Sequence, residues 1–365
     1  MERRKFLTTA GLGVAAAGTL AAPAIAQTQP EIKWRMAASW PKSLDTIFGG
    51  AEYLAKIVAE ATDNKFQIRV FAGGEIVPAL QVLDAVQNAT VEMGHTASYY
   101  YVGKDPTFVF DCTVPFGLNA RQQNAWMRHG GGTELLREFY KDYNIYNIPA
   151  GQTGAQMGGW FRKELKTVED LKGLKMRMGG WAGSVIAKLG MVPQVIGGGD
   201  IYPALEKGTI DAAEWVGPYD DEKLGFYKVA KNYYYPGWWE GNAQLSAYIN
   251  IAAWESLPKT YQAILTAACA EAYNWTVAKY DTQNPAALRR LVANGVQVRP
   301  FPREIMEASY KAAYELYDEE IKKNPKFKKV FDSWRPFRDE EHLWFRVAEQ
   351  TFDNFMYTKA AQRKS

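Results

Sequence analysis

The sequence predicts an α/β fold of two similar lobes followed by a helical C-terminal segment. Residues 32–36 and 66–70 alternate apolar and polar side chains, and residues 47–61 between them carry apolar side chains at helical spacing. The segment AVQNATVEMGHT at 85–96 is matched by ALEKGTIDAAEW at 204–215, with a constant offset of 119 residues. Both are the end of a helix that leads into a short strand, which indicates two α/β lobes of similar build.

We expect the first lobe to contain residues 27–150 plus 247–300, the second lobe residues 151–246, and a helical segment at 301–365. Residues 103–120 are expected to form a loop with one strand. A helix through Trp126 to Phe139 follows. Helices are predicted at 257–294, 302–322 and 337–361. The last is long and carries Trp344, Val347 and Phe352 on one apolar side, which must be buried on this chain or on a partner.

The first 26 residues are typical of a cleaved export signal. Arg3 and Arg4 form a basic start, an apolar Ala/Gly-rich run follows at 8–22, and Ala24-Ile25-Ala26 fits a cleavage site. The apolar run is too short for a comfortable membrane anchor. We therefore predict a periplasmic protein that begins at Gln27.

Charge and cysteine content exclude several classes of protein. Without residues 1–26 the formal charge falls from +3 to +1, and no basic tract is present, so nucleic acid is not an expected partner. Cys112 and Cys269 are either a disulfide pair or two separate buried thiols, and their apolar surroundings favour separate thiols. The sequence has no GxSxG, HExxH or P-loop motif. A binding protein therefore fits better than an exported enzyme that would use Glu214 or Glu240 as a general base.

Arg177 ends a short apolar run, LKMRM, and leads into a glycine-rich segment predicted to be helical. An arginine in an apolar strand needs a partner, and its planar fork matches a carboxylate. The partner is either the carboxylate of a ligand or a structural acid such as Asp170 or Asp211; the pattern alone does not distinguish the two.

Glu214 and Trp215 end a strand in the second lobe, as His95 and Thr96 do in the first. Ligands of open α/β sheets bind at such strand ends. A solvated Glu214 is the simple interpretation. If Glu214 instead shares the cleft with a bound carboxylate, two charges about 4 Å apart repel by about 4 kcal/mol at an effective dielectric of about 20. A proton or a bridging cation would relieve that repulsion. Glu214, a main-chain carbonyl and the amide oxygen of Gln156 suit a hard cation.

These motifs together resemble one family over essentially the whole chain after the signal. FAGGEIVPALQVLDAVQNATVEMG, LKGLKMRMGG and IYPALEKGTIDAAEW are similar to the DctP-type solute-binding proteins of tripartite ATP-independent periplasmic (TRAP) transporters. The resemblance implies a two-lobe periplasmic binding protein fold with a hinged cleft, a long C-terminal helix that forms a homodimer, and a small and a large membrane subunit as partners.

The resemblance is greatest to the branch that binds 2-oxo acids such as pyruvate together with a sodium ion. It implies that Arg177 holds the substrate carboxylate, that Gln156 contacts substrate and cation, and that Glu214 with the Trp215 carbonyl completes the sodium site. Trp215 is also expected to line the substrate pocket. Glu240 and Tyr100 are placed near the substrate by position only. Alternative ligands are a lactate-like hydroxy acid and a C4-dicarboxylate; a second fixed cation in the pocket would favour the dicarboxylate.

Overall fold

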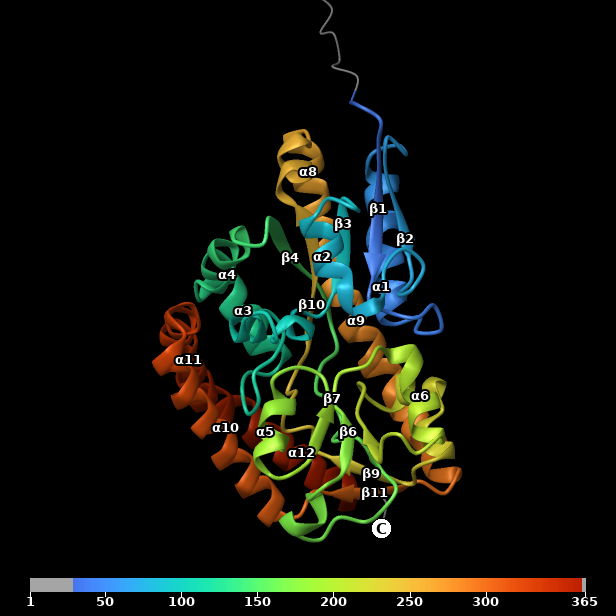
Figure 1. The fold of residues 1–365 in the computed structure, drawn as a ribbon, viewed down its shortest axis with the longest axis vertical. Coiled ribbons are helices and arrows are strands. Elements are labelled where there is room, and N and C mark those ends of the chain that lie inside the picture. The colour runs from blue at the N-terminus through green and yellow to red at the C-terminus, as the bar shows by residue number, and fades with distance from the viewer. Residues whose placement is uncertain (1–28, 363–365) are drawn as a thin grey trace, which may run out of the picture. The chain divides into compact units, whose positions relative to one another are not determined.

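A computed structural model describes residues 29–362, and its core contains two β-sheets (Figure 1). The first sheet has the strand order β2-β1-β3-β10-β4. Its strands are β1 (Ile32–Ala38), β2 (Phe66–Phe71), β3 (Met93–Thr96), β4 (Ile145–Gln152) and β10 (Gln244–Asn250). β2, β1 and β3 are parallel, and β10 is antiparallel to β3 and β4.

The second sheet has the order β11-β9-β5-β8-β6-β7. Its strands are β5 (Trp160–Phe161), β6 (Lys175–Arg177), β7 (Val192–Gln194), β8 (Ala212–Ala213), β9 (Asn232–Tyr235) and β11 (Gln297–Pro300). β7, β6 and β8 are parallel, and β5 is antiparallel to β8. β3 and β8 are thus each the third strand from one edge, after two parallel neighbours. The equivalence predicted from the 119-residue offset is therefore present in the topology.

Helices cover both sheets. The α-helices of the first half are α1 (Ile47–Ala61), α2 (Val82–Gln87), α3 (Ala120–His129), α4 (Gly132–Lys141), α5 (Ala182–Lys188), α6 (Gly198–Glu206) and α7 (Pro218–Leu224). Those that follow are α8 (Ile251–Ser256), α9 (Lys259–Ala293), α10 (Arg303–Lys323), α11 (Pro325–Phe345) and α12 (Thr351–Gln362). A π-helical turn, Arg346–Gln350, joins α11 to α12. Short 3₁₀ helices include Ser98–Tyr101, Pro106–Asp111 and Val168–Leu171.

Helix α9 links the elements around the two sheets. It packs on α1 and β4 of the first sheet and on α7, which follows β8 of the second (Figure 1). Its buried side chains include Leu265, Cys269 and Tyr280, which belong to different parts of the core. A single 35-residue helix therefore fixes the two sheet layers to a common support.

Most of the predicted elements are confirmed, and three differ. The strand expected within 103–120 is wrong: Pro106–Asp111 is a 3₁₀ helix whose N-cap, Asp105, accepts a hydrogen bond from the Thr107 N–H. The helix expected through Trp126 to Phe139 is two helices, because Gly131 has a φ of +85° that ends the first.

The C-terminal helix starts earlier than expected. Asn324 accepts a hydrogen bond from the Phe327 N–H, and Pro325 occupies the first helical position, so α11 begins there rather than at 337. Cys112 and Cys269 are buried in different clusters and unpaired, as the sequence favoured. Strand β11, which falls within the predicted first lobe, pairs with β9 of the second sheet. The residue boundaries of the lobes otherwise stay a prediction.

The predicted export signal lies outside the described residues. Within residues 29–362, none of the helices combines the length and apolar character needed to cross a membrane.

Candidate functional site

Arg177 is the last residue of β6, and its side chain is completely buried. It lies beside β8, with Arg177 in register with Ala213, so the next residue along, Glu214, comes alongside it. The Arg177 Nη1 group forms an ion pair with Glu214 Oε1 and donates a second hydrogen bond, of 2.8 Å, to the Glu214 main-chain oxygen. The acids considered from the sequence, Asp170 and Asp211, instead accept backbone N–H groups of Thr167 and Lys175.

Two polar side-chain atoms of this ion pair have no hydrogen-bond partner within residues 29–362. Glu214 Oε1 also accepts the Gly179 N–H at 2.7 Å, and Arg177 Nε donates to the Ile196 carbonyl at 3.4 Å. Arg177 Nη2 and Glu214 Oε2, both buried, have no hydrogen-bond partner among the described residues. Buried polar atoms are nearly always paired, so these two atoms indicate a place where a ligand binds.

Trp215 covers the arginine. The Arg177 guanidinium carbon lies 4.9 Å from the centre of the Trp215 ring, in cation–π geometry. Gly198, at the start of α6, lies against the other edge of this ring, and a Cβ atom there would approach the indole to 2.6 Å. Only glycine therefore allows the indole to take this position between α6 and the arginine.

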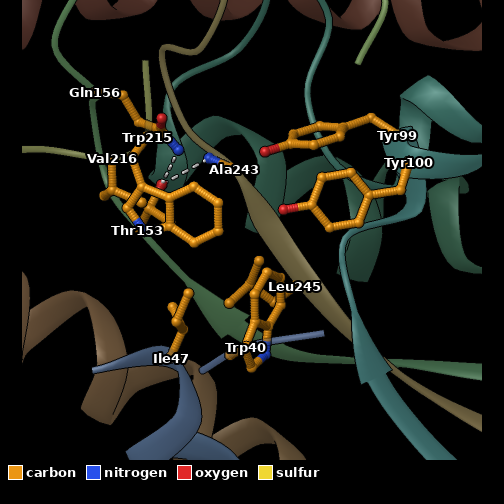
Figure 2. Close-up of a pocket in the computed structure, with 10 residues that line it drawn as sticks. All are labelled: Trp40, Ile47, Tyr99, Tyr100, Thr153, Gln156, Trp215, Val216, Ala243 and Leu245. Carbon is orange, nitrogen blue, oxygen red and sulfur yellow. Dashed lines mark hydrogen bonds between the residues drawn. The ribbon is translucent and has the colours of Figure 1, made fainter. Parts of the chain in front are cut away.

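Trp215 also forms a wall of a small pocket between residues of the two sheets (Figure 2). The lining residues are Trp40, Ile47, Tyr99, Tyr100, Thr153, Gln156, Trp215, Val216, Ala243 and Leu245. The pocket has a cavity volume of about 10 Å³, which is about the room that one water molecule needs. A solute larger than water therefore requires the walls to move apart.

Gln156 is positioned by the loop that joins β4 to β5. Its Nε2 donates to Thr153 Oγ1 at 3.2 Å, and its backbone N–H donates to the Glu240 carbonyl at 3.1 Å. Its Oε1 is buried and has no partner among the described residues, and the same holds for Glu240 Oε2. With Glu214 Oε2, three buried side-chain oxygens in this region thus lack a donor.

Tyr99 and Tyr100 approach from the first sheet, and Figure 2 shows both hydroxyl groups directed into the pocket. The ring of Tyr99 lies on Gly179 of the second sheet's side, where a Cβ atom would come within 2.8 Å of the ring. Gly179 therefore serves two purposes: its N–H binds Glu214, and its missing side chain admits Tyr99.

Burial dominates the electrostatics of the site. Burial raises the pKa of Glu214, while Arg177 and the Gly179 N–H act in the opposite direction. Burial and the neighbouring charge of Glu214 hold the pKa of Glu240 well above its usual range. Burial also raises the pKa of Tyr100, so its hydroxyl stays protonated and can donate a hydrogen bond. The charge of Arg177 acts to lower the pKa of both buried carboxyl groups, but only Glu214 forms an ion pair with it.

The structure brings the predicted site residues into one region. Tyr100, Gln156 and Trp215 line the pocket, Arg177 and Glu214 are joined to it through Trp215, and Glu240 is joined to it through Gln156. Their individual roles remain predictions.

Sequence reasoning missed Trp40, Thr153 and Leu245 as pocket residues. Thr153 directly follows β4, and Trp40 is the second residue after β1, so the rule that ligands bind at strand ends would have found both.

In the part of the chain that the structure describes, the region of the unpartnered oxygens of Glu214, Gln156 and Glu240 is not a metal centre built from several charged side chains. Among residues 29–362, no three His, Cys, Asp or Glu side chains gather closely enough to bind a metal. A cation here would therefore depend on amide and main-chain oxygens in addition to Glu214, which suits a hard, weakly bound cation.

Comparison with known proteins agrees with this fold. The profile of the bacterial extracellular solute-binding proteins, family 7 (DctP), matches residues 36–324. A monocarboxylate 2-oxoacid-binding periplasmic protein of Nostoc sp. is 51% identical over 363 residues, which cover 97% of this chain and 99% of the relative.

Two solved structures are also similar. A TRAP transporter solute-binding protein of Bordetella bronchiseptica, a dimer with calcium and picolinate in one active site, is 55% identical with a TM-score of 0.91 and covers 92% of this chain and 100% of its own. A TRAP periplasmic solute-binding protein of Pseudoalteromonas atlantica, with bound sodium and pyruvate, is 40% identical with a TM-score of 0.86 and covers 89% and 99%. The chain belongs to the DctP family of extracellular solute-binding proteins of TRAP transporters, which are receptors rather than enzymes.

Proposed function

We propose that this chain is the periplasmic receptor of a TRAP transporter and binds a small 2-oxo monocarboxylate such as pyruvate together with a sodium ion. The observation that carries the proposal is the unpartnered Arg177 Nη2 in the ion pair with Glu214, together with the unpartnered oxygens of Glu214 and of the pocket residue Gln156. A free N–H group on a buried cation can donate a hydrogen bond to a carboxylate, and free oxygens can coordinate a cation.

Arg177 would hold the substrate carboxylate through Nη2. Its Nη1 is already committed to Glu214, and the ion pair with its two additional contacts fixes the plane of the guanidinium. An arginine held in this way loses little freedom when the substrate binds, which favours affinity. Tyr100 and Glu240 would add hydrogen bonds to the substrate.

Sodium fits the remaining oxygens. The buried Glu214 Oε2 and Gln156 Oε1 lack donors, and the Trp215 carbonyl belongs to the residue between the ion pair and the pocket. A cation bound there would offset the repulsion between Glu214 and the substrate carboxylate. The sodium in the Pseudoalteromonas protein supports this choice, although the calcium in the Bordetella protein makes a divalent ion the alternative to test.

The pocket favours a monocarboxylate over a C4-dicarboxylate. None of its ten lining residues is lysine or arginine, so a second carboxylate would be buried without a cation. The first relative named above, from Nostoc, binds monocarboxylate 2-oxoacids by its description, which supports the same class.

Calorimetric titration of the purified protein tests the ligand. Pyruvate, lactate and succinate are titrated in sodium chloride, in choline chloride, and in choline chloride with added calcium. We expect pyruvate to bind most tightly and only when sodium is present. Tighter binding of lactate or succinate would overturn the 2-oxo acid, and equal affinity in choline would overturn the cation.

Export and docking to the small and large membrane subunits are part of this proposal. They rest on the family and on the signal-like residues 1–26. Cell fractionation tests the first: a processed protein beginning at Gln27 in the periplasmic fraction is expected, and full-length protein in the cytoplasm would contradict it.

We also propose a homodimer formed through the C-terminal helices. Leu343, Trp344, Val347, Phe352 and Phe355 on α11, the π-helical turn and α12 are each more than half exposed, which is unusual for so many large apolar side chains in one segment. The dimeric Bordetella relative supports a second copy as the partner. Sedimentation at micromolar concentration is expected to give a dimer for the native chain and a monomer for the double variant Phe352→Glu, Phe355→Glu; a native monomer would contradict the proposal.

A further inference from the structure

The pocket has a polar end and an apolar end (Figure 2). Gln156, Thr153 and the hydroxyl groups of Tyr99 and Tyr100 form the polar end. Trp40, Ile47 and Leu245 form the other. A solute that fits must therefore have a polar head and a hydrocarbon tail, and the walls around the tail decide how long that tail can be.

Trp40 is the largest side chain at the apolar end, and it is held in place by several contacts. It is 2% exposed, and its ring packs edge-on against Trp215 at 6.4 Å and lies 6.1 Å from Tyr100. Its main-chain oxygen accepts the Gly73 N–H at 3.0 Å. Because Trp40 comes from the first sheet and Trp215 from the second, the contact between them closes the pocket at this end.

His95 fixes the orientation of the Trp40 indole. Trp40 Nε1 donates to His95 Nδ1 at 2.8 Å, and His95 Nε2 is 3.2 Å from the Ala150 carbonyl. Nε2 must donate to that carbonyl, so Nδ1 carries the lone pair that accepts the indole N–H. Burial lowers the pKa of His95 to about 4, so the ring stays neutral and keeps this acceptor under ordinary conditions.

We propose that Trp40 sets the maximum length of the hydrocarbon tail of the bound 2-oxo acid, and that His95 is the positioning residue that holds Trp40 in the required orientation. The proposal rests on the proposed function, because it assumes that the carboxylate lies at Arg177 and the oxo group at the polar end. The carbon chain then continues toward Trp40, Ile47 and Leu245. The hydrogen bond to His95 and the contact with Tyr100 both come from the side of the first sheet, so they hold the indole in place when the walls move apart, and each further methylene meets it.

The experiment compares chain-length selectivity between variants. Pyruvate, 2-oxobutyrate, 2-oxopentanoate and 4-methyl-2-oxopentanoate are titrated calorimetrically in sodium chloride into the native protein and into Trp40→Ala, Trp40→Phe, His95→Leu and His95→Asn. Trp34→Phe is the matched control. Trp34 lies on β1, the strand that leads to Trp40, and is buried, but it packs on Phe66 and does not line the pocket.

The expected readout is the ratio of the affinities for 2-oxopentanoate and pyruvate. One methylene in an apolar pocket changes affinity by about 10- to 200-fold, so Trp40→Ala should raise the ratio at least about tenfold. Trp40→Phe should raise it in the same direction and by less. His95→Leu, which leaves the indole N–H without an acceptor, should also raise it. His95→Asn, whose amide oxygen can replace Nδ1, should restore the native ratio, and Trp34→Phe should leave it unchanged.

An unchanged ratio in Trp40→Phe, with pyruvate still bound, would overturn the role of Trp40 and leave the proposed function intact. If His95→Leu lowers the affinities for all four acids by the same factor, His95 has only a structural role, and its proposed role in positioning Trp40 is overturned. If the native protein binds none of the four acids, the proposed function fails and this inference fails with it. Trp40→Phe, whose ring still fills most of the site, decides the question should Trp40→Ala not fold.

Discussion

Glu214 and Asp221 are two buried carboxylates of the same part of the molecule, seven residues apart, with different surroundings. Asp221 accepts hydrogen bonds on both oxygens: Oδ2 from Trp160 Nε1 at 2.8 Å and the Tyr233 hydroxyl at 2.7 Å, and Oδ1 from the Val216 N–H at 3.2 Å. Glu214 has donors on Oε1 only. Burial is the same in both cases, so burial alone does not identify a binding residue; the unpartnered oxygen does.

The two carboxylates also differ in charge balance. Glu214 faces Arg177, whereas Asp221 has no cation beside it, and burial raises the pKa of Asp221 to about 7. Asp221 is therefore held by neutral donors and serves the fold, while Glu214 is held by a cation that itself has a free donor. We expect substitutions of the Glu214 pair to change binding and substitutions of Asp221 to change stability.

The largest effect is expected for Arg177→Ala. Losing a charge-assisted hydrogen bond to a carboxylate in a buried site costs about 3 kcal/mol or more, so affinity for pyruvate should fall at least about 100-fold. Arg177→Lys keeps the charge but lacks the planar guanidinium, so it should recover only part of the lost affinity. Calorimetry checks both, with circular dichroism to show that each variant is folded. If the affinity of Arg177→Ala for pyruvate stays within threefold of the native value, the proposed binding role of the Arg177–Glu214 pair is contradicted.

Asp221→Asn should lower stability and spare binding. Both oxygens of Asp221 accept hydrogen bonds, whereas an asparagine amide has only one acceptor oxygen, so a buried donor such as the Val216 N–H is left unsatisfied, which costs about 1–3 kcal/mol. Urea unfolding at pH 5 measures this loss, and pyruvate affinity should remain within threefold of native. A tenfold loss of affinity in a folded Asp221→Asn protein would mean that Asp221 also acts on the site.

The pH dependence of Asp221 sharpens the same contrast. Its pKa is about 7 in the folded chain and near 4 when unfolded, so its folded state binds the extra proton between these values. Its contribution to stability is therefore complete below pH 4 and is lost as pH rises through 7. Between pH 5 and pH 8 the free energy of unfolding of the native protein should fall by about 3 kcal/mol relative to that of Asp221→Asn. The fall occurs over roughly two pH units, from pH 5 to the pKa of about 7, at about 1.4 kcal/mol for each unit.

Comparison with Asp221→Asn removes the contributions of groups that do not interact with Asp221. Asp111 and Asp220, with pKa values raised to about 6, act in the same direction as Asp221, and His95, with its pKa lowered to about 4, acts against it. Asp111 and His95 are common to both proteins and cancel in the difference, whereas Asp220 interacts with Asp221 and is part of the measured effect. A difference that is constant from pH 5 to pH 8 would show that Asp221 does not change its protonation.

Glu214→Gln should remove the dependence of binding on sodium. Without the anion there is no repulsion for a cation to offset, and one charged oxygen ligand is lost. Removal of a residue that only hydrogen-bonds to a metal-coordinating side chain weakens metal binding about 10- to 100-fold. Removal of the charge from the coordinating side chain itself should weaken it at least as much. Pyruvate titrations at several sodium concentrations test it. An unchanged sodium dependence would remove Glu214 from the cation site.

The smallest effect is expected for Gly179→Ala. The added Cβ meets the Tyr99 ring at 2.8 Å, so the ring must shift and affinity should fall by up to about tenfold. Gly199→Ala is the matched control, because a Cβ at Gly199 meets nothing within 4 Å. Equal affinities of the two variants would show that the position of Tyr99 does not matter for binding.

The sequence predicted the elements whose patterns are local. Helix α1 and strands β1 and β2 follow from apolar spacing, and the shared place of β3 and β8 follows from the 119-residue offset. Arg177 stood out because charge in an apolar strand is costly. The strand expected within 103–120 failed because the side chain of Asp105 caps a 3₁₀ turn, and a local hydrogen bond of this kind does not change the apolar pattern.

The sequence by itself determined three features: two similar α/β units, an arginine in an apolar strand, and an acidic residue at the strand end of the second unit that corresponds to His95 in the first. Only the tertiary structure decided that Arg177 pairs with Glu214, 37 residues away, rather than with Asp170 or Asp211, and that β11 joins the second sheet. It alone also brought Trp40 and His95, 55 residues apart, to the apolar end of the pocket. Periodicity reports which face of an element is buried, but the partner across a sheet or a cleft depends on how the elements pack, which spacing along the chain does not encode.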